Sequence, residues 1–468
     1  EMLALLRRAL RWGMKRDKVK RNVALLCELP EGRPGRPSKS LTFEQAHARL
    51  EQVSDALAAA DANLRGKQDL ADASRRMRLP ELSLEARYME FQKTLELPPG
   101  SLAPVAEAFG IDSPLRFRQR DWRMRPMVTA VLPLYTGGQI PAAQGAAAAA
   151  VREADAERAQ QAQRLVSELV EAYFGLRLAG QVVAVRREIR DGMERHLAHT
   201  ALLEREGFAT RAQRLQATVA RDASEREYRK AVNERDAASA GLALMLRSGG
   251  PLVPATPLFV DSAPVGTLEE FTRAALDNHP QLAQLRALDA QAGEGVRAQQ
   301  AALKPQVFLF GQYDLHREDA LLTDPDWAFG VGVKYTFLSG RDRPRRISAA
   351  RAQQDQAQAA LREAQNRVAI GVAQAWNALE TARQQYLLQD SSIGHARENL
   401  RLQELSFREG QSTSLDVIDA RLGLGGALVE RARAAFEYDV ALARLLELSG
   451  QSARFADHIR RADHKVLP

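Results

Sequence analysis

The sequence lacks the long apolar runs that cross a membrane as helices. No stretch approaches the roughly 18 apolar residues that such a helix needs, and 27% of the residues are charged. Cys27 is the single cysteine, which excludes an intramolecular disulfide framework and a cysteine-based zinc site. The eight histidines are scattered without a metal-ligand spacing, and no nucleophile–base pair or phosphate loop is present. We therefore expect no metal site, no cofactor, no catalytic residue and no enzyme activity.

The excess of positive charge is confined to one end of the chain. The net charge is +7, and residues 1–40 alone contain eleven basic and four acidic residues. The remaining residues are therefore balanced, which argues against a basic nucleic-acid groove along the body. The apolar stretches in this region are too short for a secretory signal, and Leu26 stands where lipidation at Cys27 would need a small residue. Residues 1–40 are thus a basic extension without an assigned role.

The rest of the chain reads as one unit used twice. A shift of 225 residues places Thr42 on Thr267, and a shift of 203 places Gly207 on Gly410. The change of 22 residues between the two shifts predicts a longer loop after Tyr88 than after Tyr313. Each unit contains a helical stretch, two strands, a helix of about 65 residues and a return helix after a glycine turn. The expected segments are a first repeat at 41–250, a Pro-rich linker at 251–266, a second repeat at 267–450 and a C-terminal tail at 451–468.

The strands carry different residue types on their two faces. In LPELSLEARY, residues 79–88, apolar residues alternate with charged ones, and KPQVFLFGQY at 304–313 repeats the pattern. One interpretation is a sheet packed on helices with its polar face in water. The other is a membrane barrel with lipid outside and water inside. Because such barrels need at least about eight strands, four strands per chain would then require an oligomer.

The hairpins expected at 80–135 and 305–338 supply the residues for the barrel interpretation. Aromatic residues near the ends of the strands, such as Trp327, would lie at the membrane interfaces. The positions expected to face lipid are Leu82, Leu84, Tyr88, Val128, Val307, Leu309, Tyr313, Val331, Val333 and Tyr335. The positions expected to face the lumen are Glu81, Glu85, Arg87 and Lys334.

The duplicated unit resembles the TolC-like outer-membrane efflux channel family. The strongest match is FREGQSTSLDVIDARLGLGGALVERARAAFEYDVALARLLELSG at 407–450, with its aromatic-x-x-Gly turn, its DVIDA helix start and its late aromatic–Asp pair. LPLYTGGQ at 132–139 resembles the strand-to-helix junction of the family. The resemblance implies a mainly α fold with a small β part, in which three chains share one transmembrane β-barrel, with four strands per chain. A long α-helical barrel continues it.

The resemblance also implies a location and partners. A homotrimer in the outer membrane of a Gram-negative cell would extend through the periplasm and meet an adaptor protein and an inner-membrane pump. It would be the exit duct of a tripartite efflux or type I secretion system, with the transported substrate left open. One alternative is a soluble, elongated helical scaffold whose basic tail binds nucleic acid or an anionic membrane. Another is a periplasmic adaptor, although two equal repeats argue against it.

The resemblance places the two glycine turns at the periplasmic mouth. There Asp416 and Asp419 match aspartates that form rings in the pore, which would favour cations. Helix capping and solvent exposure are the alternatives for this pair. Phe407 and Ser412 depart from the tyrosine and arginine of the family pattern. The residues expected at the tip turns and in adaptor docking are Gly207, Thr210, Arg211, Gly410, Ser412 and Thr413.

Overall fold

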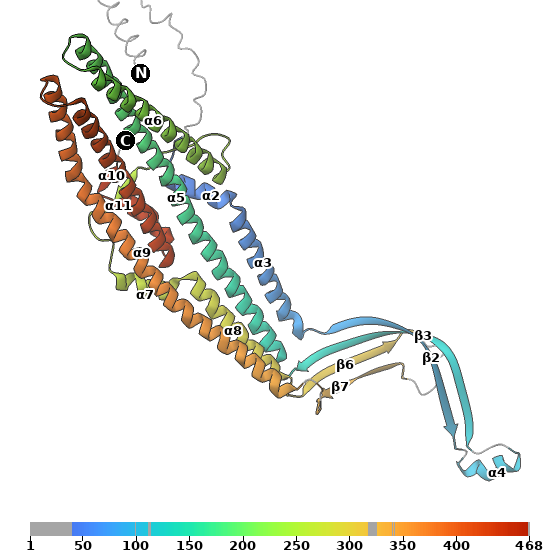
Figure 1. Cartoon of the computed structure of the whole chain (residues 1–468). Coiled ribbons are helices and arrows are strands. Elements are labelled where there is room, and N and C mark those ends of the chain that lie inside the picture. Colours follow the sequence, from blue (N-terminus) through green and yellow to red (C-terminus); the bar gives the residue numbers. More distant parts are fainter. Residues whose placement is uncertain are drawn as a thin grey trace, which may run out of the picture.

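The protein is an elongated bundle of long helices from one end of which a sheet projects (Figure 1). The computed structural model describes residues 40–98, 100–110, 114–316, 325–338, 340 and 342–466. The expected basic extension, up to residue 39, lies outside the described residues. Within them, no helix is both long enough and apolar enough to cross a membrane. The predicted mainly helical fold with a small β part is confirmed.

The same order of elements occurs twice along the chain. The first series is α2 (Phe43–Val53), α3 (Asp55–Arg75), β2 (Glu81–Leu97), β3 (Leu115–Tyr135), α5 (Gln139–Arg205) and α6 (Arg211–Met245). The second is α7 (Leu268–Asn278), α8 (Pro280–Ala301), β6 (Gln306–Asp314), β7 (Trp327–Lys334), α9 (Arg343–Arg408) and α10 (Ser414–Leu448). The helices α5 and α9 have 67 and 66 residues, so each is about 100 Å long.

The first helical stretch of each series consists of two helices separated by a break. Ser54 ends α2 and caps α3, since its hydroxyl accepts a hydrogen bond from the amide of Leu57. His279 does the same between α7 and α8, with Pro280 at the first helical position. Both residues have extended backbone, which interrupts the helical hydrogen bonds. The break therefore recurs at the spacing of the repeat, 225 residues apart.

The hydrophobic core lies where the linker and the tail cross the long helices. In the linker, β4 (Val253–Pro254) pairs with β1 (Ser40–Leu41), and β5 (Leu258–Val260) pairs with β8 (His464–Val466) of the tail. The tail also forms a short 3₁₀ helix (Ser452–Arg454) and α11 (Phe455–Arg461). The ring of Phe455 lies 5.1 Å from Phe43 and 6.0 Å from Phe174, centre to centre. Linker and tail are thus parts of the core.

The four strands form one antiparallel sheet in the order β2-β3-β6-β7. β2 and β3 have 17 and 21 residues, more than the roughly 9–11 residues that suffice for a strand of a membrane barrel. The prediction of a longer loop directly after Tyr88 is wrong, because β2 continues to Leu97. Alternation continues past Tyr88, so the inserted residues extend both strands. The extension ends in a 3₁₀ turn (Gly100–Leu102) and α4 (Ala103–Ala108), which Figure 1 shows at the far end of the molecule. β7 ends at Lys334, so Tyr335 lies one residue beyond the strand.

Candidate functional site

The register of the sheet brings the predicted apolar positions onto one face. Leu84 pairs with Val128, and Val128 pairs with Tyr313 across the next two strands. Leu309 and Val331 pair in the same way between β6 and β7. Most of these side chains are exposed within the chain, with Leu82 at 73% and Val333 at 68%. The sheet therefore presents a broad apolar surface that no described part of the chain covers.

The opposite face of the sheet carries the charges. Glu81, Glu85, Arg87 and Lys334 lie on it, as expected from the sequence. Arg123, Arg125 and Asp314 lie on it as well, and the sequence reasoning missed them. The Nε of Arg125 is 2.8 Å from the carboxylate of Asp314, and Arg123 donates to the carbonyl of His316 at 3.0 Å. In the sequence, Arg123 and Arg125 flank the apolar Met124. This alternation could have predicted that both arginines lie on the charged face.

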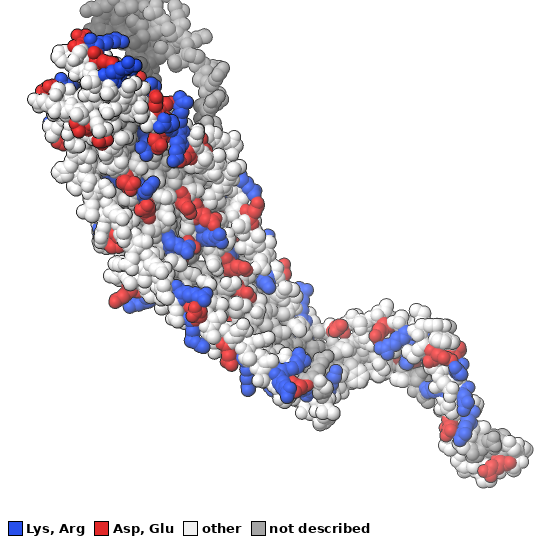
Figure 2. All heavy atoms as spheres, in the orientation of Figure 1, with Lys and Arg blue, Asp and Glu red and all other residues white. Residues whose placement is uncertain are grey.

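Aromatic side chains gather at both ends of the apolar face. At the end far from the helices, Tyr88 and Trp122 stack with ring centres 5.3 Å apart, and Trp327 stacks on Phe329 at 5.7 Å. At the end next to the helices, Tyr335 meets Phe337 edge to face at 4.7 Å. On the face seen in Figure 2, basic and acidic residues are interspersed along the helices, whereas the sheet next to them is mainly uncharged.

The turns between the long helices are built alike at the other end of the molecule. Gly207 and Gly410 have φ angles of 81° and 74°, in the left-handed region that favours glycine. Thr210 and Thr413 then begin the return helices as the first residues of capping boxes. Three adjacent hydroxyl residues, Ser412, Thr413 and Ser414, could cap the second return helix, and Thr413 is the residue that does so. The neighbouring Ser412 instead donates to the carbonyl of Gln403.

The two aspartates of the second turn have different surroundings. The carboxylate of Asp416 accepts hydrogen bonds from the amide and the hydroxyl of Thr413, both at 2.7 Å. These bonds stabilise the charged form and lower the pKa of Asp416. Asp419 lies nearly one turn further along α10, is exposed, and has no hydrogen-bond or ion-pair partner among the described residues. Both carboxylates therefore lie at the surface of the single chain.

Behind the second turn, α5 is joined to α9 and α10 by a buried polar cluster. Nε2 of His196 and Oγ of Ser414 lie 2.7 Å apart, and the ring of Phe407 packs on His196 at 5.0 Å. Burial, Arg421 and His199 lower the pKa of His196 to about 4, so its imidazole is neutral at neutral pH. Phe407 thus contributes packing here, where a tyrosine hydroxyl would have offered a hydrogen bond.

An ion pair extends this cluster. Arg421 of α10 binds Glu404 of α9, and its guanidinium lies where a side chain on Gly192 of α5 would be. The sequence identified Phe407 but not its contact with His196 or the Arg421–Glu404 pair beside Gly192, because α5 is far from α9 and α10 along the chain. At the first turn, Arg214 binds Glu204 at 2.5 Å, while Arg211 is exposed.

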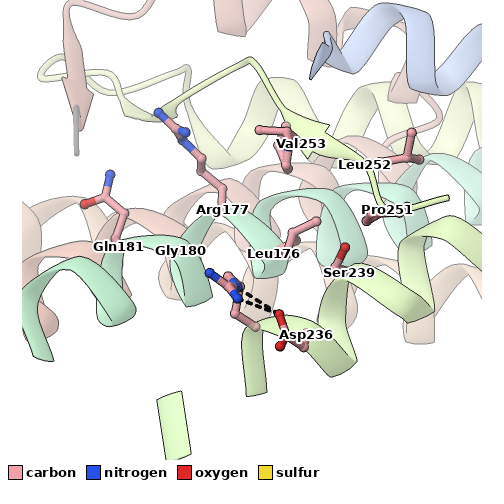
Figure 3. A pocket seen from close by; sticks show the side chains of 11 residues that line it. Leu176, Arg177, Gly180, Gln181, Asp236, Ser239, Pro251, Leu252 and Val253 are labelled. Atoms are coloured by element: carbon pink, nitrogen blue, oxygen red, sulfur yellow. Dashed lines mark hydrogen bonds and ion pairs between the residues drawn. The ribbon is translucent and has the colours of Figure 1, made fainter. Parts of the chain in front are cut away.

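A cavity of about 490 Å³ lies midway along the helices, between α5, α6 and residues 251–254 (Figure 3). Its wall is mostly apolar, with Leu176 and Leu252 among the lining residues. Arg235 is bound to Asp236 at 2.6 Å on one side. None of the predicted site residues lies in it. Among the described residues, no group of three or more His, Cys, Asp or Glu is placed to hold a metal ion.

Curated relatives match parts of the chain. A segment of 45 residues is 64% identical to an integrase of Streptomyces ambofaciens. This segment makes up 10% of this chain and 12% of the integrase. A segment of 196 residues is 26% identical to the outer membrane efflux protein BepC of Brucella suis, 40% of this chain and 41% of the relative. The chain therefore spans less than half the length of either curated relative.

A family model matches one part of the chain, and a solved structure covers most of it. Residues 272–451 match the family model of the outer membrane efflux protein. The outer-membrane channel OprN superimposes with a TM-score of 0.72 at 19% identity, over 87% of this chain and 90% of that one. The chain thus has the fold of these channels over most of its length. Together, these matches confirm its resemblance to the TolC-like outer-membrane efflux channel family.

Proposed function

We propose that three copies of this chain form a channel in the outer membrane that serves as the exit duct of an efflux or secretion system. The observation that supports this best is the sheet, with an exposed apolar face, a charged opposite face and an edge strand on each side, β2 and β7. Lipid accepts an apolar face, but it leaves no partner for the backbone of an edge strand. Pairing of β7 with β2 of the next copy would close the sheet.

The number and length of the elements agree with this assembly. Three copies would supply twelve strands, above the minimum of about eight for a membrane barrel. The aromatic pairs at both ends of the apolar face match the two girdles of such barrels. Helices about 100 Å long, packed side by side and built from two copies of one unit, would continue the barrel as a tunnel across the periplasm.

The tip would form the periplasmic mouth. In a trimer, Asp416 and Asp419 would give two rings of three carboxylates, which attract cations and repel anions. The capping role of Asp416 is compatible with this, because capping keeps its carboxylate charged. An adaptor protein would dock on the tip turns, where Thr210, Arg211 and Ser412 lie, and would connect the channel to an inner-membrane pump. We propose no catalytic activity.

The decisive experiment measures single-channel conductance and cation preference of the purified protein in a lipid bilayer. Asp419→Ala should lower the ratio of cation to anion permeability several-fold, because it removes three charges from the constriction. Asp416→Asn should act in the same direction while keeping oxygen for the cap. Glu269→Ala, which removes an exposed acid from α7, is the matched control and should leave the ratio unchanged.

Two results would contradict the proposal at different levels. A soluble monomer without conductance would exclude the channel and would favour the elongated scaffold. That alternative has no support from the fold, and the 45-residue match to an integrase covers too little to transfer a function. A conducting trimer whose ion preference is the same in both aspartate variants would keep the channel and remove the two carboxylate rings.

A further inference from the structure

The part of the β2–β3 hairpin beyond Tyr88 and Trp122 projects past β6 and β7 and ends in α4 (Figure 1). We call this part the distal hairpin; it comprises residues 89–97 of β2, 115–121 of β3 and the helical turns between them. The pairing of the two strands is uninterrupted from Glu81 to Leu97. Even-numbered residues of both strands therefore share one face throughout, and odd-numbered residues share the other.

The two faces exchange their character where the distal hairpin begins. Up to Tyr88 and Trp122, the even face carries the apolar side chains of the sheet. Beyond them the same face turns polar and charged, with Glu90, Gln92, Thr94, Glu96, Arg116, Arg118 and Arg120. Ion pairs cross it, from Arg120 to Glu90 at 2.8 Å and from Arg116 to Glu96 at 3.0 Å. The face that would contact lipid within the sheet is therefore unsuited to lipid beyond it.

The odd face changes in the opposite direction. Within the sheet it carries charges such as Glu85 and Arg125, whereas in the distal hairpin apolar residues outnumber the polar Lys93, Gln119 and Asp121. Its apolar members are Met89, Phe91, Leu95, Leu97, Leu115 and Phe117. Phe117 is 55% exposed and Leu97 is 46% exposed, and Phe109 at the end of the hairpin is 80% exposed. An apolar surface of this kind on a two-stranded ribbon needs a partner, since an isolated ribbon is barely stable in water.

We infer that the partner is the distal hairpin of the other two copies, so that three hairpins pack through their odd faces into a collar above the barrel. This inference rests on the trimeric channel proposed above. The odd face continues the side of the sheet that would line the lumen, so in a three-fold assembly the three apolar faces start from the same rim. The charged even faces then point outward into water. The stacked Tyr88 and Trp122 mark the level at which lipid gives way to solvent.

Cysteine cross-linking in membranes tests the collar. In a Cys27→Ser background, Phe117→Cys and Leu95→Cys, which pair across the odd face, should form covalent dimers with a short bifunctional maleimide. Their neighbours Arg118→Cys and Thr94→Cys lie on the even face and are matched controls, which should cross-link at least several-fold less. All four positions are partly or fully exposed in the single chain, so folding should tolerate each substitution.

The mass of the detergent-purified protein is measured in parallel, which separates the collar from the channel. A trimer without preferential cross-linking at Phe117 and Leu95 would overturn the collar and leave the channel intact. Quenching of a fluorophore on Phe117→Cys by brominated lipid would also overturn it, because the odd face would then lie on the membrane. A monomer would overturn both proposals. Preferential cross-linking in a trimer is the expected result.

Discussion

At the scale of single residues, a buried carboxyl group at the centre of the molecule is the least expected feature. Asp439 of α10 is completely buried, and neither of its side-chain oxygens has a hydrogen-bond partner among the described residues. Burial and the nearby Asp261 raise the pKa of Asp439 well above its ordinary value. The sequence identifies this residue as half of the late aromatic–Asp pair but does not show its burial, because burial depends on β5 crossing from the linker.

The variant Asp439→Asn should therefore change how stability depends on pH. A raised carboxyl pKa means that the folded protein holds a proton which the unfolded chain releases. Stability is thus largest below about pH 4, the unfolded pKa, and falls by about 1.4 kcal/mol per pH unit above it until the folded pKa is reached. Asp439→Asn has no carboxyl group to titrate and therefore lacks this loss of stability. The difference in apparent Tm between the variant and wild type should increase in favour of the variant from pH 4 to pH 7.

Glu437→Gln is the matched control for this prediction. Glu437 lies two residues earlier on the same helix and is exposed. It should follow the wild-type dependence of Tm on pH. A constant difference between Asp439→Asn and wild type over this range would show that Asp439 is not protonated in the folded protein.

At the scale of elements, the alternation along the strands predicted which residues share a face but not how far the strands run. Leu84, Val128 and Tyr313 lie in one row because the register of three strands aligns them. The loop expected after Tyr88 is strand in the structure. Apolar and polar residues still alternate there, but the apolar residues lie at odd-numbered instead of even-numbered positions. A prediction that follows one apolar face therefore ends the strand at Tyr88. The helix breaks at Ser54 and His279 were missed because apolar periodicity continues across them.

Substitution within β2 tests which face meets lipid. A lysine on the lipid face near the middle of a membrane barrel costs about 2–4 kcal/mol, whereas one on the water-filled side costs little. Leu84→Lys should therefore reduce the amount of trimer assembled in the outer membrane, as measured by extraction and mass analysis. Ser83→Lys, on the adjacent residue of the opposite face, should assemble nearly as wild type. Equal assembly of the two variants would contradict the assignment of the faces.

At the scale of the whole molecule, one chain leaves the sheet open on both sides. In the described part of the chain β2 and β7 are edge strands, and long exposed edges invite pairing with another chain. The sequence predicted four strands per chain and hence an oligomer. The sequence did not predict the order of the strands. The structure shows this order, and with it the two edge strands, β2 and β7, that would have to pair between copies.

Hydrogen exchange followed by mass spectrometry tests the closure. In the trimer, amides of β2 (81–88) and β7 should be as protected as those of the central strands, because both edges are paired. In dissociated monomers the edge strands should exchange much faster than β3 and β6. Faster exchange of β2 and β7 in the trimer itself would show that the sheet stays open.

The length of α5 and α9 determines how far apart substitutions at the two ends of the molecule lie. Substitutions at the tip and in the sheet lie about 100 Å apart, far beyond the distance at which their effects on stability become coupled. The tip proposed to dock an adaptor and the sheet proposed to face lipid can therefore diverge independently. A tip exchanged for that of a relative should leave membrane insertion as it was.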